Sequence, residues 1–214
     1  MKHKIEKNTV QETLILPLYS RKLCTELYPN LYQDETAVRL IDEIDYDFSE
    51  AEKNSRSLMQ RFGALEVAMR QNDLAWEVRD YLKTHPSAAV FFASGVFYYF
   101  LTQQVKALVQ QMADAFSGGV LVFDAANRTA VKMIAKTWLR TAKIKDVGAY
   151  FAVSDAPKEI GEWDNRLQVT SRGYMLGYND LRDHSVSGFF RFLARVGDNG
   201  MKMRIVKIRF GGKA

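Results

Sequence analysis

Two groups of small and polar residues each follow a predicted strand near the middle of the chain. The first group is Ser94, Gly95, Phe97 and Tyr98, and the second is Asp124, Ala125 and Asn127. In an open α/β sheet, ligands bind outside the carboxyl ends of the parallel strands. Gly95 would let a ligand approach the backbone, Tyr98 could stack or hydrogen-bond, and Asp124 could accept from a hydroxyl or ammonium group. Each residue also has a structural interpretation: Gly95 as a turn residue, Tyr98 as a helix-facing aromatic and Asp124 as a helix N-cap. The sequence leaves the functional and the structural interpretation open.

Most familiar catalytic motifs have no counterpart in the sequence. It contains no paired-carboxylate motif, no G-x-S-x-G, no G-x-x-x-x-G-K and no H-E-x-x-H. The single Cys24 has no neighbouring histidine, and His3, His85 and His184 are too scattered for a zinc site. We therefore expect no metal, no internal disulfide and neither hydrolase nor kinase chemistry. A reducing, cytoplasmic location fits the cysteine content best.

A predicted βαβ unit positions the two groups of candidate residues. The apolar run 88–93 is typical of a strand buried on both faces. Apolar residues recur every three or four positions over 102–116, which predicts an amphipathic helix, and the run 120–124 predicts a second buried strand. Strand, helix and strand in this order indicate a parallel pair with a right-handed crossover.

The chain divides into a helical part, residues 1–86, and an α/β part, residues 87–214. In the first part the apolar spacing and the capping residues predict four helices, over 11–27, 34–44, 55–69 (or 57–69) and 73–82. Asp73 is expected to cap the fourth of them, and Pro17 to begin or kink the first. Beyond the βαβ unit we expect helices over 129–140, 155–163 and 185–195, and strands over 167–174 and 201–210.

Composition excludes several classes of protein. The 214 residues, 47% hydrophobic and 26% charged, suit one globular domain with a small cap. The net charge of +5 lacks the clustered basic patch of a nucleic-acid site and is expected to be solvated. The longest apolar stretch, 88–101, is too short to span a bilayer, and the N-terminus shows no secretory signal. Neither nucleic acid nor a membrane is an expected partner.

Four blocks of sequence together resemble the leucine carboxyl methyltransferase family. They are ETLILPLYSRKL, DETAVRLIDEIDYDFS, LEVAMRQNDLAWEVRDYLKTHP and FFASGVFYYFLTQQVKALVQQMADAFSGGVLVFDA. The bacterial branch with the tetracenomycin-type polyketide O-methyltransferases is the most similar, and the resemblance runs from about Glu12 to the end. It implies an α/β fold, a Rossmann-like class I methyltransferase sheet with an N-terminal helical cap and an antiparallel last strand. It also implies S-adenosylmethionine as cofactor and methyl transfer to a carboxylate or hydroxyl oxygen of a small-molecule acceptor.

The resemblance implies a cofactor role for four residues. Arg70 matches the cap arginine that holds the cofactor carboxylate, a task that suits the forked donors of a guanidinium. Gly95 falls in the fourth-strand motif beside the cofactor, and Ser94 stands where many relatives have an acidic residue. Arg21, or Lys22 in its place, corresponds to a second basic contact. The alternative for Arg70 is a solvated arginine near a helix end.

The resemblance also implies an acceptor pocket, but it identifies no catalytic residue. A carboxylate acceptor is already ionised, so it needs no general base. The polar side chains that could line the pocket are Tyr98, Tyr174, Tyr178, Arg172 and His184, with Arg172 suited to a substrate carboxylate.

One segment of the family pattern is absent. In the family a run like HPSAAV begins the first strand and leads to a glycine-rich loop, a helix and a second strand that ends in an acidic residue for the ribose. Here Val90 passes directly into FFASGVFYYF, the family's fourth strand. An internal deletion after the first strand, or a stretch lost from the record, would account for this.

The missing segment supports an alternative function. A catalytically inactive deletion variant would act as an interaction module or as a subunit. Loss of central strands would leave open sheet edges and exposed apolar side chains such as Phe91, Phe92 and Val96. Such edges favour strand pairing between chains, so a homodimer is the expected assembly.

Overall fold

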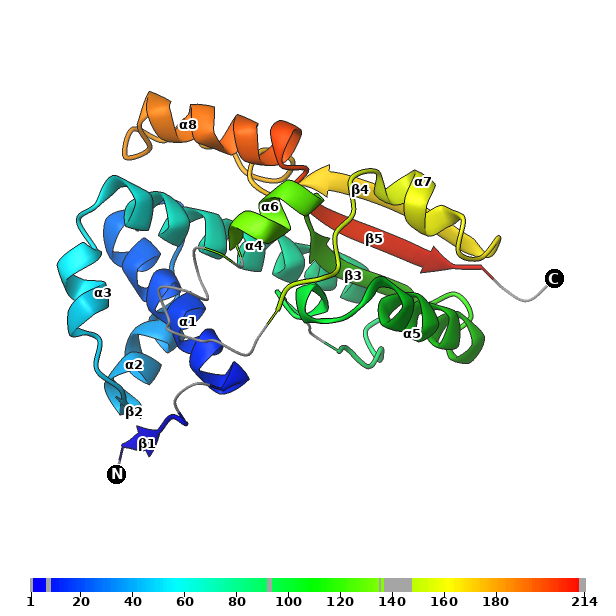
Figure 1. Cartoon of the computed structure of the whole chain (residues 1–214), viewed down its shortest axis with the longest axis horizontal. Coiled ribbons are helices and arrows are strands. Elements are labelled where there is room, and N and C mark those ends of the chain that lie inside the picture. The colour runs from blue at the N-terminus through cyan, green and yellow to red at the C-terminus, as the bar shows by residue number, and fades with distance from the viewer. Residues whose placement is uncertain (1, 7–8, 92–93, 135, 137–147, 212–214) are drawn as a thin grey trace.

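The computed structural model describes residues 2–6, 9–91, 94–134, 136 and 148–211 and has a mixed α/β architecture. Its N-terminal part contains α1 (Val10–Leu27), α2 (Glu35–Glu43), α3 (Ser49–Asn54) and α4 (Leu58–Leu82). Two short parallel strands, β1 (His3–Lys4) and β2 (Ile44–Asp45), join the start of the chain to the end of α2. Figure 1 shows α1, α2 and α3 gathered at one end of the molecule, with α4 extending from them toward the sheet.

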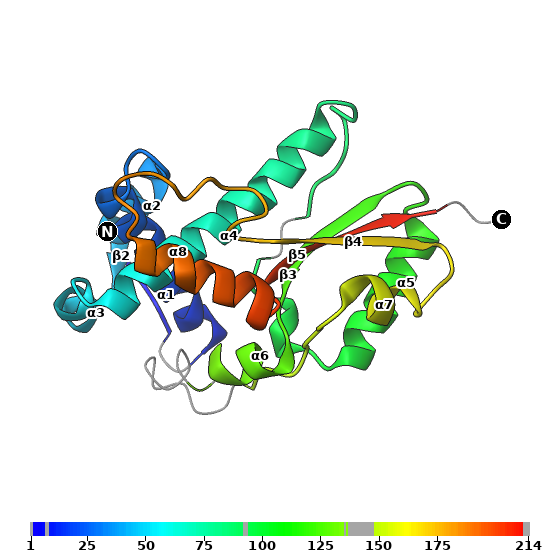
Figure 2. The ribbon, with the colours of Figure 1, turned by 90° about the horizontal axis from the view of Figure 1, so that it is seen from above.

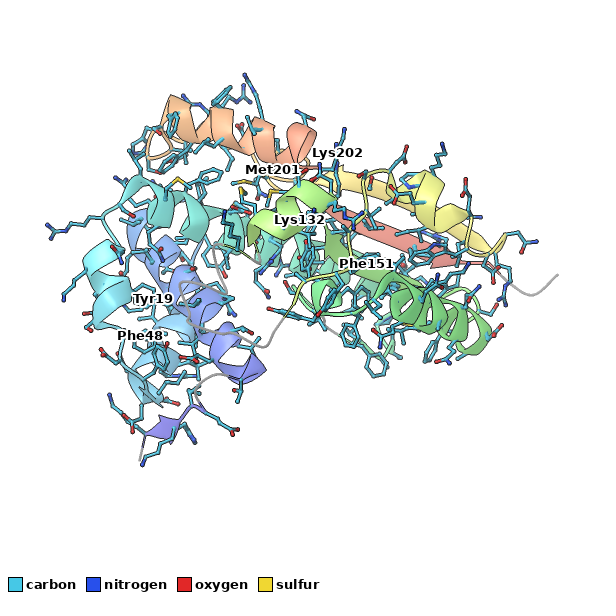
Figure 3. The ribbon with its side chains drawn as sticks, viewed as in Figure 1. Tyr19, Phe48, Lys132, Phe151, Met201 and Lys202 are labelled. Carbon is cyan, nitrogen blue, oxygen red and sulfur yellow. The ribbon has the colours of Figure 1, made fainter. Side chains whose placement is uncertain are left out.

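Local sequence explains where these helices begin. Asp34 caps α2 by accepting from the Ala37 backbone N–H, and Ser57 caps α4 by accepting from the Gln60 N–H. Tyr19 of α1 stacks on Phe48 just before α3, with ring centroids 5.4 Å apart (Figure 3). This contact joins the first helix to the loop that precedes the third.

Two of the expected helices are one. The prediction of separate helices over 55–69 and 73–82 is wrong, because α4 runs unbroken from Leu58 to Leu82. Asp73 is therefore inside a helix rather than at its N-cap. The helix continues because residues 70–73 include no proline or glycine and pack against the rest of the protein. α1 runs from Val10 to Leu27 with Pro17 in its interior, so the helix does not start at Pro17, one of the two alternatives for this residue.

A three-stranded sheet forms the centre of the C-terminal part. Its strands are β3 (Val120–Ala125), β4 (Leu167–Gly173) and β5 (Arg204–Phe210), in the order β3-β5-β4. β5, the last strand, is antiparallel to both neighbours, as the resemblance implies for the last strand. Around the sheet lie a 3-10 turn η1 (Phe97–Tyr99) and the helices α5 (Thr102–Ala115), α6 (Arg128–Ile134), α7 (Ala156–Gly161) and α8 (Gly188–Arg195), which continues into the π-helix η3 (Val196–Gly200).

The predicted βαβ unit is not formed by the described residues. Residues 88–91 are irregular, and Phe92 and Ala93 lie outside the described residues. The helix and the second strand are present as α5 and β3, but the described partner of β3 is β5, which is antiparallel. The run 88–91 has no strand on its other side to bury it, and Phe91 is 78% exposed. A strand buried on both faces needs packed neighbours, and the described residues provide none of this kind beside 88–91.

The two faces of the sheet pack against different helices. Val206, Ile208 and Phe210 of β5 share a buried cluster with residues of α5 and α7. Ile205 faces the other way, into a cluster with α1, α4 and α8. This follows from the alternation of side chains along a strand. Figure 2 shows α5 and α7 on one side of the strands and α4 on the other.

The remaining predictions hold in part. α8 begins at Gly188, capped by Ser187, rather than at residue 185. α6 covers the start of the predicted helix 129–140, and residues 137–140 lie outside the described residues. Among the helices that the structure describes, none is long and apolar enough to cross a membrane.

Candidate functional site

One side of α4 carries four charged residues, Glu66, Arg70, Asp73 and Glu77. Their spacing of four, three and four places them in one row along the helix. The row faces partners that lie far away in the sequence. The Tyr174 hydroxyl donates to Glu66 (3.0 Å), Arg70 Nη1 to Asp124 (3.3 Å), Asn179 Nδ2 to Asp73 (2.7 Å), and both the Tyr178 hydroxyl (2.7 Å) and Lys207 Nζ (2.6 Å) to Glu77.

Arg70 uses few of its donors. Its side chain is 17% exposed and makes one described ion pair, with Asp124 at the end of β3. The Nε atom is buried and has no hydrogen-bond partner in the described part of the chain. Burial favours the neutral guanidinium, but Asp124 and the other negative groups around it outweigh this and raise the pKa of Arg70. Arg70 is therefore a buried cation with spare donors, not a solvated arginine.

The carboxylate of Asp124 connects Arg70 to Gly95. Asp124 is 2% exposed, and its Oδ1 accepts from the Gly95 backbone N–H at 2.7 Å. Gly95 has φ of +70°, and a Cβ built there would lie 3.4 Å from Arg70 Nη1. Asp124 is thus part of a buried charge cluster rather than a helix cap. Arg70, Gly95 and Asp124, which the sequence places in three separate segments, meet in space.

Replacing Gly95 by alanine should lower the free energy of unfolding by about 1–2 kcal/mol, because a left-handed backbone disfavours a Cβ. The new methyl group would lie in van der Waals contact with the Arg70 guanidinium. Chemical denaturation measures the effect. Gly161→Ala is the matched control, because a Cβ there meets no atom within 4 Å and lies in helix α7, so no loss is expected. Equal effects of the two substitutions would contradict the assigned backbone strain.

Tyr98 and Tyr174 border the same cluster. Both are almost fully buried, and burial raises the pKa of each hydroxyl well above its usual value. The negative charge of Asp124 adds to the rise in the pKa of Tyr98. Ser94 adjoins Gly95 in the chain. Since both phenols stay protonated at neutral pH, they can donate hydrogen bonds but cannot serve as bases.

Asp73 is the residue of this row that the sequence analysis assigned to a different role. It is fully buried, its Oδ1 accepts from Asn179, and its Oδ2 accepts no hydrogen bond from any residue that the structure describes. Burial, the main cause, and the negative charges of Asp198 and Glu77 raise the pKa of Asp73 to about 8. Its carboxyl group therefore holds a proton near neutral pH. Its position three residues after Arg70 was the available sequence signal.

Other predicted site residues lie elsewhere. Arg21 donates from Nε to Asp34 at 2.8 Å, and Lys22 pairs with Glu26, so both are engaged within the helical part. His184 is 85% exposed in the loop before α8. Asn127 caps α6 by accepting from the Ala130 N–H. None of these four is brought to the Arg70 cluster by a described contact.

Arg172 and Tyr178 line a polar hollow of about 280 Å³. The Arg172 guanidinium lies 5.4 Å from the Tyr178 ring centre and 6.0 Å from that of Trp76. Lys207 and Glu77 line the same hollow. The structure therefore brings Arg172 and Tyr178 together beside Glu77, which lies one turn of α4 beyond Asp73.

A larger, apolar cavity of about 800 Å³ lies between α4, residues 88–91, the end of α5 and strand β3. Its lining includes Leu74, Phe91, Phe116 and Val122, whereas neither Arg70 nor Asp124 reaches it. Of the charged row on α4, Glu77 lines this cavity and Arg70 does not.

Within the described part of the chain, no group of three or more potential metal ligands occurs. Cys24 is buried, and burial raises the pKa of its thiol to about 12, so it is not an activated nucleophile. Comparison of the chain with protein-family models, with curated proteins and with solved structures gave no match.

Proposed function

We propose that the chain is an S-adenosylmethionine-dependent O-methyltransferase whose Arg70 and Asp73 hold the amino-acid end of the cofactor. The acceptor would be a small molecule with a carboxylate or hydroxyl oxygen. One observation carries the proposal: among the described residues, neither buried Arg70 Nε nor buried Asp73 Oδ2 has a hydrogen-bond partner. They lie on the same side of α4, one a cationic donor and the other an acidic acceptor.

An α-amino acid group offers the complement of these two atoms. Its carboxylate would accept from Arg70, and its ammonium would donate to Asp73 once that carboxyl ionises. Buried polar atoms without partners are rare. A ligand that forms hydrogen bonds with both Arg70 Nε and Asp73 Oδ2 would gain binding free energy from each bond. The fit concerns the amino-acid end of the cofactor. For the nucleoside end, the described residues provide neither a glycine-rich loop nor an acidic residue after a second strand.

The architecture supports the same proposal. A helical part precedes the sheet, and the last strand is antiparallel to its neighbours. Both features are implied by the resemblance to leucine carboxyl methyltransferases. When bound, S-adenosylmethionine would supply the methyl group. Arg70 and Asp73 would orient it, while the phenols of Tyr98 and Tyr174 would donate hydrogen bonds near the Arg70 cluster.

A catalytically inactive variant that acts as an interaction module or subunit is the second candidate. The observation that favours it is the irregular path of residues 88–91, which leaves an apolar cavity beside β3. In this view the charged row of α4 stabilises the fold and binds no ligand.

Calorimetric titration with S-adenosylmethionine and S-adenosylhomocysteine separates the two candidates. We expect binding that weakens at least tenfold in Arg70→Lys, which keeps the charge but loses the Nε donor, and in Asp73→Asn. Arg79→Lys and Asp80→Asn, on the same helix but outside the row, are the matched controls and should bind as the original chain does. Absence of heat at millimolar ligand, with folded protein, would leave the interaction module as the function.

The pH dependence of binding provides an independent signature. Because Asp73 holds a proton near neutral pH, capture of an ammonium group must release that proton, so affinity should rise as the pH increases toward about 8. Titration in buffers of different ionisation enthalpy measures the released proton. A proton count of zero, or an affinity that falls over this range, would remove Asp73 from the binding site.

A further inference from the structure

The outer edge of β3 carries backbone groups that pair with no other described segment. Phe210 N donates to Gly119 O, so residues 119 and 210 form a hydrogen-bonded pair. Hydrogen-bonded pairs alternate along an antiparallel ladder. With the observed register, Leu121 and Phe123 therefore bond to β5, and the N–H and C=O groups of Val120 and Val122 point away from it. No described residue forms a hydrogen bond with these outward groups.

The same edge is apolar and adjoins the large cavity. Val120, Leu121 and Val122 line the cavity together with Phe91 and Phe116, which are 78% and 49% exposed. No charged side chain interrupts the strand from Val120 to Phe123. Natural proteins usually protect an edge strand with a charge, a proline or a bulge, and this stretch has none of these.

We propose that a second copy of this chain covers the edge, with the two β3 strands paired antiparallel about a twofold axis at Leu121. The outward groups at positions 120 and 122 match themselves in this register. Val120 of one copy lies opposite Val122 of the other, and each such pair exchanges two backbone hydrogen bonds. The interface is isologous, which is the common form of a dimer contact. It also covers the apolar lining of the cavity, Phe91 included.

The other edge of the sheet is a poorer candidate. β4 alternates apolar residues with polar ones, among them Gln168, Thr170 and Arg172, and α7 packs against it. Gly211 N donates to Arg166 O, so with the observed register residues 168, 170 and 172 of β4 form the hydrogen bonds to β5. Val169 lies between two of these positions, and its N–H therefore points away from β5. Val169 is thus the equivalent of Val122 on the opposite edge.

The test is the oligomeric state of the full chain and of two proline variants, measured by sedimentation from micromolar to near-millimolar concentration. We expect the original chain and Val169→Pro to form a species of twice the 24.5 kDa chain mass, and Val122→Pro to remain a folded monomer. Proline at an outward-facing edge position removes the outward N–H and spares the bonds to β5. A dimer that persists in Val122→Pro, or that is lost in Val169→Pro, overturns the proposal.

Amide hydrogen exchange of the original chain gives a result even if a proline variant fails to fold. In the dimer the amides of Val120 and Val122 should exchange as slowly as those of Leu121 and Phe123, and dilution should speed the first pair alone, by about tenfold or more. Fast exchange at Val120 and Val122 at every concentration, in a monomeric protein, would show that no second copy pairs with this edge. The inference does not depend on the proposed enzymatic function.

Discussion

Arg70→Ala is expected to lower the free energy of unfolding by about 3–5 kcal/mol, because it leaves a buried carboxylate without its cation. Asp124 is 2% exposed, and after the substitution the described hydrogen bond left to its carboxylate would be the one from the Gly95 amide. The loss arises from this unpaired charge more than from the pair itself. Denaturant unfolding at neutral pH measures it.

The controls for Arg70 distinguish a buried ion pair from a surface one. Arg39→Ala removes an arginine that is 71% exposed and 3.9 Å from Glu43, and it should change stability by less than about 0.5 kcal/mol. Asp124→Asn in the Arg70→Ala background should recover part of the loss, since it removes the orphaned charge. A loss below about 1 kcal/mol for Arg70→Ala would mean that water reaches Asp124 freely.

Asp73→Asn is expected to remove a pH dependence of stability between about pH 4 and pH 8. The pKa of Asp73 is raised from 3.8 to about 8 in the folded chain, so over this range the folded state holds a proton that the unfolded state has released. The contribution of Asp73 to the free energy of unfolding is fully present below about pH 4, and it is lost as the pH rises through 8. Each pKa unit corresponds to about 1.4 kcal/mol, and native-state relaxation keeps the expected loss on the order of 3 kcal/mol.

The difference between the original chain and the variant isolates this contribution. The amide oxygen that Asp73→Asn introduces can accept from Asn179 as the Asp73 carboxyl group does. The two proteins should therefore be similarly stable near pH 4 and should diverge as the pH rises, with the variant more stable at pH 8. Glu66 and Asp198, whose pKa values burial also raises, affect both proteins equally. Asp80→Asn, at a side chain 42% exposed, should leave the pH profile unchanged. Parallel profiles for Asp73→Asn and the original chain would assign the buried proton to another group.

Local sequence was sufficient for most of the secondary structure. The apolar periodicity over 102–116 predicted α5, and the alternation and runs near 167–174 and 201–210 predicted β4 and β5 within a few residues. Capping by Asp34, Asp155 and Ser57 also follows from side chains that reach backbone groups three residues on. These features depend on neighbours in the chain, which the sequence displays directly.

The errors arose where a long-range partner decides the outcome. A continuous apolar run such as 88–93 becomes a buried strand only if strands flank it, and here residues 88–91 have none. Asp73 has the residue type of an N-cap, yet packing of α4 against the sheet keeps the helix continuous through it. In both cases a correct local preference was overruled by what lies beside the segment.

The sequence by itself determined the mixed α/β class, the helical N-terminal part and the antiparallel last strand that the resemblance implied. Only the tertiary structure decided which polar residues form a site. Arg70 and Asp124 are 54 residues apart, and Tyr174 reaches Glu66 across 108. The properties that distinguish these groups, the unpartnered Arg70 Nε and the protonated Asp73, come from removal of water by distant segments. Desolvation and pairing depend on three-dimensional neighbours, so no local pattern of residues records them.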